Sequence, residues 1–336
     1  MRMLAHLKVV DLTVDLGSYA GVMLAELGAD VLLAEWRAPI GDAAEVAMAR
    51  RGKRVRALAL DDPELAALID EADIVLRGPE TFPGSTTRNP KLIDVAILPF
   101  DAGRANEARP ATDLTLMARS GLLTIGGDPD RAPLALPGRQ AWALAGIQGA
   151  IAALTALHAR AASGRGQIVT VSAHRSAVLA NYREPLTYEW TGRVGNRTGN
   201  LLVRGKSGVR QVWSAADGHV TWALVDNPPM MRAIVAQMGG MAGALAEVDW
   251  EAILVADMPQ EVLQGWEALV GAWLATKSRA ELTALSNKHG MGLSAISEPA
   301  DVIASAHLNA RGLWRDAVVD GHEVRVPGPL FLRSDA

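Results

Sequence analysis

Residues 145–172 read AGIQGAIAALTALHARAASGRGQIVTVS, and this stretch decides the fold class. Its small residues predict a long helix over Ala141–Arg160 that packs closely against neighbouring elements. The Gly164-Arg165-Gly166 sequence predicts a turn. The β-branched residues that follow predict a strand over Gln167–Ser172. A helix that leads directly into a strand is typical of an α/β domain.

The first hundred residues repeat this alternation of strands and helices. A strand is expected at Leu7–Leu12, a helix at Tyr19–Leu27 that ends at Gly28, and a strand at Val31–Glu35. Such units build an open, doubly wound, mostly parallel sheet, whose ligands bind beyond the carboxyl ends of the strands. Further strands are expected at Ala57–Leu60, Asp73–Leu76 and Lys91–Ile97, with a helix from Pro63 to about Glu71.

The sequence changes in character after residue 192. Residues 193–210 are rich in Gly, Arg and Asn, which predicts a linker with loops. Strand-like segments flank Asp217-Gly218 and predict a hairpin. The following segments predict a smaller α+β domain over 211–298, with helices at Pro229–Met238, Asp249–Val255, Gln260–Leu274 and Arg279–His289.

Composition excludes several classes of protein. The chain has 336 residues, 49% hydrophobic and 21% charged, as in globular domains. The absence of Cys excludes disulfides, thiol nucleophiles and Cys-ligated metals. A net charge of −4 without a basic stripe argues against nucleic acid. Asp11 and Asp15 interrupt the N-terminal apolar run, which argues against a signal peptide. We therefore expect a cytoplasmic protein. We also expect no membrane partner and no bound metal.

The sequence contains neither of two common nucleotide-binding motifs. Neither G-x-G-x-x-G after the first strand nor G-x-x-x-x-G-K-[ST] occurs, so nicotinamide-dinucleotide and P-loop sites have no support. Other segments, spread over nearly the whole chain, do form a recognisable series, which resembles the family III CoA-transferases, the formyl-CoA and carnitine CoA-transferase group. These segments are LKVVDLT (7–13), YAGVMLAELGADVLLAE (19–35), RRGKR (50–54), ATDLTLMARSGLL (111–123), ALHARAASGRGQIVTVS (156–172), DGHVTWAL (217–224), VGAWLATKSRAEL (270–282), HLNARGLWRD (307–316) and VRVPGPLF (324–331).

The resemblance implies a fold and an assembly. It implies a Rossmann-like sheet in a large split domain, formed by residues 1–192 and by residues 299–336 of the tail. The linker 193–210 and the small domain 211–298 lie between these two parts. The resemblance also implies an interlocked homodimer, in which each subunit is a ring threaded by its mate.

The resemblance also implies covalent catalysis by an Asp. That carboxylate attacks an acyl-CoA thioester, forms a mixed anhydride, and passes enzyme-bound CoA to an incoming acid. The Asp lies about four residues before the Gly that opens the long helix. Here the Gly is Gly146 and the position is Trp142, whose indole cannot form an anhydride. Asp113 is a weak alternative that we interpret as a helix N-cap. The related racemases need the same Asp and a His where this chain has Thr112.

The CoA contacts implied by the resemblance are mostly basic. Arg50, Arg51, Lys53, Arg54 and Arg56 form the densest basic run, which is either a clamp on CoA phosphates or a solvated loop. The loop after Thr13 supplies donors near the thioester oxygen in the family, and Asp15 there would oppose negative charge. The predicted CoA-binding residues are Val14, Arg37, Arg51, Lys53, Arg54 and Arg77.

Three further residues have both a functional and a structural interpretation. Gly146 and Gly149 allow the close approach of a ligand, of a mate chain or of a packed helix. His174 follows a strand end as a possible base, although a lone His is more often structural.

The leading hypothesis is therefore a protein that binds coenzyme A or an acyl-CoA and exchanges CoA between carboxylic acids. One alternative is a silent homologue, or a subunit of a heteromer whose paralogous partner carries the Asp. Another alternative is an acyl-CoA isomerase or lyase that uses other residues.

Overall fold

The structure is a computed structural model that describes residues 3–81, 88–101, 103, 111–204 and 206–328. The chain divides into two compact units. Unit 1 comprises residues 1–126, 133–195 and 310–336, and unit 2 comprises residues 127–132 and 196–309.

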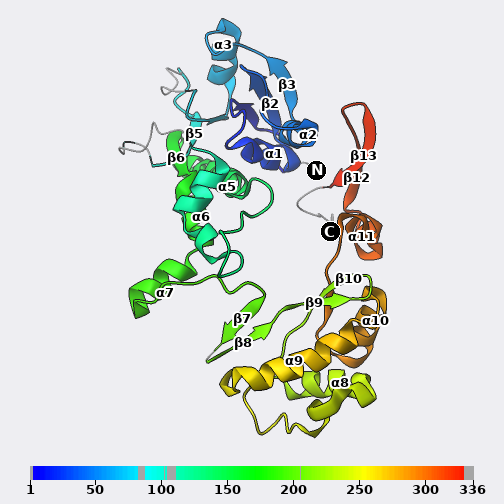
Figure 1. The fold of residues 1–336 in the computed structure, drawn as a ribbon. Coiled ribbons are helices and arrows are strands. Elements are labelled where there is room, and N and C mark those ends of the chain that lie inside the picture. The colour runs from blue at the N-terminus through cyan, green and yellow to red at the C-terminus, as the bar shows by residue number, and fades with distance from the viewer. Residues whose placement is uncertain (1–2, 82–87, 102, 104–110, 205, 329–336) are drawn as a thin grey trace. The chain divides into compact units, whose positions relative to one another are not determined.

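Unit 1 is built on a six-stranded sheet in which every pairing is parallel. The strand order is β3-β2-β1-β4-β5-β6, so the direction of winding reverses between β1 and β4. Figure 1 shows β2 and β3 toward one end of this sheet and β5 and β6 toward the other. This order is that of a doubly wound sheet, as expected. The strands are β1 Lys8–Asp11, β2 Asp30–Glu35, β3 Arg54–Ala57, β4 Ile74–Arg77, β5 Ile93–Leu98 and β6 Gln167–Ser172.

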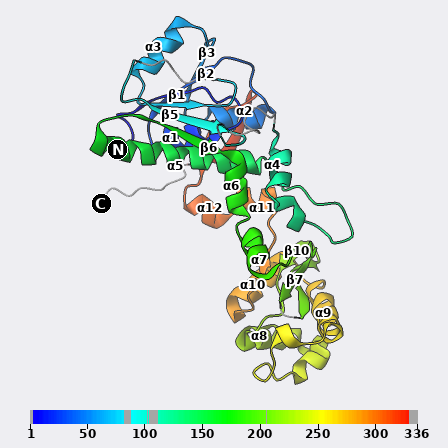
Figure 2. The same cartoon turned by 90° about the vertical axis from the view of Figure 1, so that its left-hand side faces the viewer.

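Helices cover both faces of this sheet. In Figure 2, α3 lies on one side of the strands, and α1 and α5 lie on the other. Local signals explain where α3 begins. Asp62 accepts a hydrogen bond from Glu64 N at 2.8 Å, and Pro63 starts α3. The helices of unit 1 are α1 Ser18–Glu26, α2 Ala43–Arg50, α3 Pro63–Glu71, α4 Asp113–Arg119, α5 Gln140–Ser163, α6 Ala173–Ala180 and α7 Arg183–Thr191, with a 3₁₀ turn at Leu122–Ile125.

The long helix α5 packs through small residues. A Cβ added at Gly146 would lie 2.4 Å from the Cβ of Tyr19, and one at Gly149 would lie 2.6 Å from Cδ1 of Ile97. These glycines therefore allow α5 to approach α1 and β5 closely, which is their structural interpretation. By length and composition α5 could cross a membrane, but its glycine and alanine face is buried in the core of unit 1.

Two elements of unit 1 differ from the expectation. The strand expected at Ala57–Leu60 is β3 at Arg54–Ala57, and α2 was not expected. β3 is an edge strand, and Arg54 and Arg56 pair with Asp30 and Glu64 beside it. Charged edge strands lack the apolar alternation by which strands are predicted, which explains the misplaced strand.

A C-terminal hairpin also belongs to unit 1. β12 Trp314–Val319 pairs antiparallel with β13 His322–Pro327. The turn between them places Asp320 at φ 49° and Gly321 at φ 77°, as a tight hairpin turn requires.

Unit 2 has its own core of apolar side chains. Gln260–Leu274 (α9) and Arg279–His289 (α10) form as expected, and the hairpin at Asp217-Gly218 is confirmed. The aromatic part of the core is Trp213, Trp222, Trp250, Trp266 and Trp273. The remaining elements are β7 Leu201–Arg204, β8 Ser207–Arg210, β9 Val212–Ala215, β10 Gly218–Thr221, α8 Pro228–Met238, β11 Ser294–Ala295, α11 Pro299–Ala304 and α12 Ala306–Ala310, with 3₁₀ turns at Gly239–Glu247 and Val255–Asp257.

Two predictions in this region were wrong. The segment 193–210, predicted as a linker with loops, contains the hairpin of β7 and β8, because Val209 has a buried side chain that supports it. The helix predicted at Asp249–Val255 is absent. The N–H of Val255 donates instead to Asp226 Oδ1 at 2.5 Å, which holds this segment in a turn.

Candidate functional site

Two neighbouring cavities lie where β1 and β2 end, at the carboxyl edge of the sheet. Ligands of doubly wound sheets bind at this edge near the reversal of strand order. Val14, directly after β1, lines both cavities, and so does Ile40 in the loop after β2.

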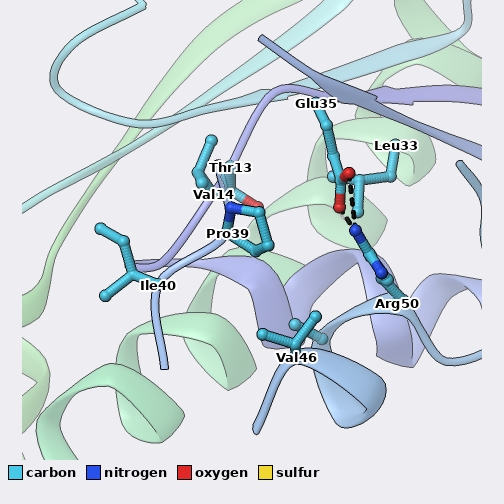
Figure 3. Close-up of a pocket in the computed structure, with 9 residues that line it drawn as sticks. Thr13, Val14, Leu33, Glu35, Pro39, Ile40, Val46 and Arg50 are labelled. Carbon is cyan, nitrogen blue, oxygen red and sulfur yellow. Dashed lines mark hydrogen bonds and ion pairs between the residues drawn. The ribbon is translucent and has the colours of Figure 1, made fainter. Parts of the chain in front are cut away.

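An ion pair forms part of the lining of the smaller cavity (Figure 3). Glu35, the last residue of β2, accepts hydrogen bonds from Arg50 Nε at 2.7 Å and Arg50 Nη2 at 2.8 Å. The hydrogen bond to Glu35 raises the pKa of Arg50 above its ordinary value. Val14, Ile40 and Val46 provide apolar walls around the pair. Arg50 is thus fixed at the end of α2.

The larger cavity has a volume of about 390 Å³, enough for the reacting part of a small ligand. It is lined by the loop after β1, the first turn of α1, α2 and the start of α5. Tyr19 and Trp142 give it aromatic walls. Its charged lining residues are Asp15, Glu45 and Arg139.

Arg139 joins the two carboxylates of this cavity. Its Nη1 donates to Asp15 Oδ1 at 2.5 Å, and its Nε and Nη2 donate to Glu45 at 2.9 and 3.0 Å. Burial lowers the pKa of Arg139, but the hydrogen bonds and charges of Glu45 and Asp15 outweigh this and raise it. The guanidinium therefore stays charged, and it offsets the negative charge that Asp15 brings to the loop.

Trp142 is nearly buried, with 8% of its surface exposed, and it lines the larger cavity. Its backbone N–H donates to Asp113 Oδ1 at 3.0 Å. The interpretation of Asp113 as the N-cap of its own helix was wrong. Thr112 caps α4 through a capping box with Thr115, whereas Asp113 serves a first-turn N–H of α5. Arg139, the residue before α5, gives that helix no side-chain cap of its own.

The basic run does not form one open cluster. Lys53 Nζ lies 2.7 Å from Asp11 Oδ2, and neither side chain is exposed. Arg51 pairs with Glu26 at 2.8 Å and also donates to the Gly328 carbonyl at 2.7 Å. Arg54 and Arg56 pair bidentately with Asp30 and Glu64. Each cation of the run has a carboxylate partner, and their contact with CoA stays a prediction.

The other two predicted arginines lie beside the ends of their strands, as expected. Arg37 follows β2, pairs with Glu80, and has its guanidinium 4.9 Å from the Trp36 ring. Arg77 ends β4, is 4% exposed, and donates to Asp94 Oδ1 at 2.6 Å. The buried position of Arg77 indicates a role in holding β4 and β5 together.

His174 lies apart from these cavities. Its Nε2 is 3.3 Å from the Arg119 carbonyl oxygen, and its ring packs on Phe100 at a centroid distance of 5.7 Å. These contacts fit its structural interpretation.

Sequence reasoning missed Glu45 and Arg139 as parts of the site. Asp42 and Glu45 form a capping box, with Glu45 N 2.9 Å from Asp42 Oδ1. The D-x-x-E spacing could have predicted α2, and with it a carboxylate at this edge. No local pattern marks Arg139, because its partners lie about 94 and 124 residues away along the chain.

The sequence profile of CoA-transferase family III matches residues 4–335. The chain belongs to CoA-transferase family III. Family III relatives include the succinyl-CoA:(R)-benzylsuccinate CoA-transferase subunit BbsE of Thauera aromatica, at 23% identity over 97% of this chain and 87% of the relative. The succinate–glutarate CoA-transferase of Agrobacterium fabrum is 27% identical, over 97% of this chain and 87% of its own. The succinyl-CoA:mesaconate CoA-transferase of Haloarcula hispanica is 26% identical, over 97% and 88%.

A solved structure shares the family III fold seen here. The structure of a CaiB/BaiF family protein from Brucella suis has a TM-score of 0.79 at 23% identity. The match covers 97% of this chain and 95% of that one. At this identity the likeness supports the fold alone.

Proposed function

We propose that this protein exchanges CoA between an acyl-CoA thioester and a carboxylic acid, at the larger cavity. The observation that carries the proposal is the cavity itself, at the edge of the sheet where a family III chain is expected to react. Val14, predicted to contact CoA, and Trp142, at the predicted nucleophile position, line this one cavity. We further propose that the enzyme acts in the cytoplasm, as an interlocked homodimer.

Succinyl-CoA is the first donor to test. The relatives from Thauera and Haloarcula are named for succinyl-CoA, and the relative from Agrobacterium is named for succinate and glutarate. For the CoA phosphates we propose Arg37 and Arg54, whose side chains are 34% and 62% exposed. A guanidinium can donate two parallel hydrogen bonds to a phosphate once the phosphate replaces its carboxylate partner.

A second candidate follows from Trp142. Its indole occupies the cavity wall where the family resemblance places an Asp. The relative from Thauera is named as a subunit. The chain would then be the CoA-binding subunit of a heteromer, and a paralogous partner would bring the reactive carboxylate.

The test is an exchange assay with succinyl-CoA and a panel of carboxylic acid acceptors, followed by chromatography of the CoA esters. Wild type is compared with Trp142→Asp and with Trp142→Phe, which keeps an aromatic wall. The first candidate predicts exchange by wild type and by Trp142→Phe. If wild type is inactive and Trp142→Asp exchanges CoA, the second candidate is favoured. If calorimetry detects no binding of CoA or succinyl-CoA, both candidates are excluded.

A further inference from the structure

The larger cavity holds carboxylates of its own, although position 142 is Trp. Its lining includes Asp15, in the loop after β1, and Glu45, on α2. Asp113 is not part of this lining, and its Oδ1 is used by the backbone of Trp142. The carboxylates that can meet a substrate in this cavity are therefore Asp15 and Glu45.

Hydrogen bonding distinguishes these two carboxylates. Both oxygens of Glu45 accept from Arg139, and its Oε2 also accepts from Asp42 N at 3.2 Å. Asp15 accepts from Arg139 through Oδ1 alone. Within the described residues Oδ2 of Asp15 has no hydrogen-bond donor, and the side chain is 23% exposed. Arg139 thus orients Asp15 and leaves one oxygen available to a ligand.

The surroundings of Asp15 favour developing negative charge. Ser18 and Tyr19 in the first turn of α1 line the cavity, as do Gln140 and Trp142 in the first turn of α5. At α5 the N–H of Trp142 already donates to Asp113, but α1 begins at Gly17 without a side-chain cap, so the partial positive charge of its N-terminus acts on this space. Together with the Arg139 guanidinium, this N-terminus can stabilise an oxyanion or a departing thiolate.

We infer, resting on the proposed function, that Asp15 is the carboxylate that carries CoA between the two acids. Asp15 Oδ2 attacks the thioester carbonyl carbon, a C–O bond forms, the C–S bond breaks, and CoA leaves as a thiolate. The product is a mixed anhydride. The thiolate then attacks Cγ of Asp15, which releases the donor acid as a carboxylate and leaves CoA in an aspartyl thioester.

The acceptor acid reverses these steps. Its carboxylate oxygen attacks Cγ of Asp15 and displaces the thiolate, which gives a second anhydride. The thiolate attacks the acyl carbon of the acceptor, and Asp15 leaves as a free carboxylate. Electrons and charge balance without an oxidant or a proton donor.

The test traps the aspartyl thioester. Wild-type protein is incubated with succinyl-CoA, treated with hydroxylamine, digested and mapped by tandem mass spectrometry. Because an aspartyl thioester reacts with hydroxylamine, we expect a hydroxamate on Asp15. A hydroxamate on Glu45, on Asp113 or on another residue would overturn the assignment.

Three variants complete the experiment. Asp15→Asn keeps an acceptor for Arg139 but removes the nucleophile, so we expect exchange to fall at least a hundredfold with CoA binding retained. Asp113→Asn removes the rival carboxylate. Asp62→Asn makes the same chemical change at the N-cap of α3, where Asn serves equally well. Neither of these two is expected to lose exchange or labelling.

The outcomes separate this inference from the proposed function. Undiminished exchange by Asp15→Asn would overturn the role of Asp15 and leave CoA transfer intact. A wild-type chain that binds succinyl-CoA but forms no hydroxamate and exchanges no CoA would overturn the inference in favour of the heteromer. Absence of CoA binding would overturn the proposed function itself.

Discussion

At the scale of single residues, the basic side chains from Arg50 to Arg56 are held in ion pairs with carboxylates of unit 1. The sequence shows this run as a basic cluster that is either a clamp on CoA phosphates or a solvated loop. Its carboxylate partners were not predicted, because Asp11, Glu26 and Asp30 lie on β1, α1 and β2 and become neighbours of the run only in the folded unit. The most buried of these pairs, Lys53 with Asp11, is therefore a product of strand order.

This pair gives a stability prediction. Lys53→Met would leave the Asp11 carboxylate buried without its cation, which costs about 3–5 kcal/mol in the free energy of unfolding. Arg54→Gln removes an exposed partner of Asp30 and should cost less than about 1 kcal/mol. Urea unfolding of both variants measures the difference, and equal costs would contradict the buried pair.

Glu267 gives a prediction about pH. Burial raises the pKa of Glu267 above its ordinary value, against the opposing effect of the Arg210 backbone N–H, which donates to it at 2.6 Å. A raised pKa in the folded state means that the native protein binds the proton more tightly than the unfolded chain does. The stability from this group is fully present below the ordinary Glu pKa and is lost as pH rises through the raised value.

Glu267→Gln should therefore become more stable relative to wild type as pH rises through that window, and show no such gain below it. Urea unfolding at a series of pH values measures this trend. Glu247→Gln changes an exposed carboxylate of the same unit and should show a flat difference. A flat profile for Glu267→Gln as well would contradict the assigned pKa direction.

At the scale of elements, the parallel sheet and its covering helices were predictable, because buried strands and small-residue helices repeat with clear periods. The two elements of unit 1 that were missed or displaced, α2 and β3, are short and have no buried residues. The position of β3 depends on long-range pairing, which a local pattern does not record. Arg139 was missed for the same reason, since its partners are distant in sequence, whereas the capping box of α2 is a local signal that marks Glu45.

The packing of α5 on α1 gives a prediction at this scale. In Gly146→Ala the new Cβ would lie 2.4 Å from Tyr19 Cβ and 3.2 Å from Ala20 N, so α1 has to move. We expect a loss of about 1–3 kcal/mol. Gly265→Ala makes the same change within α9, where no atom lies within 4 Å of the new Cβ, and should gain about 0.5–1 kcal/mol. Thermal unfolding compares them, and a gain in both would refute the close contact.

At the scale of the whole molecule, the described residues form separate hydrophobic cores in the two units, with two clusters of buried side chains in unit 1 and one in unit 2. The existence of a second, smaller unit was predictable from the change in composition after residue 192. The membership of residues 127–132 in unit 2 was not predictable. It depends on a contact between distant parts of the chain, in which the N–H of Gly199 donates to the Gly127 carbonyl.

The separate cores predict separate local stabilities. Leu263→Ala opens a cavity at a side chain with no exposed surface, which costs about 2–5 kcal/mol. Hydrogen exchange should accelerate in residues 196–309, while strands β1 to β6 keep their protection. Val262→Ala, at a neighbouring and more exposed position, is the control. Equal acceleration in both units would show instead that they unfold as one.

The indole of Trp142 also allows ligand binding in the larger cavity to be followed by tryptophan fluorescence. A ligand that enters the cavity displaces water from this ring and changes its emission, so binding can be followed without a label. Five of the eight other indoles lie in the core of unit 2, away from the lining of this cavity, and supply a steady background. They are Trp213, Trp222, Trp250, Trp266 and Trp273. The residue that departs from the family pattern is thus a built-in fluorescent reporter of the site.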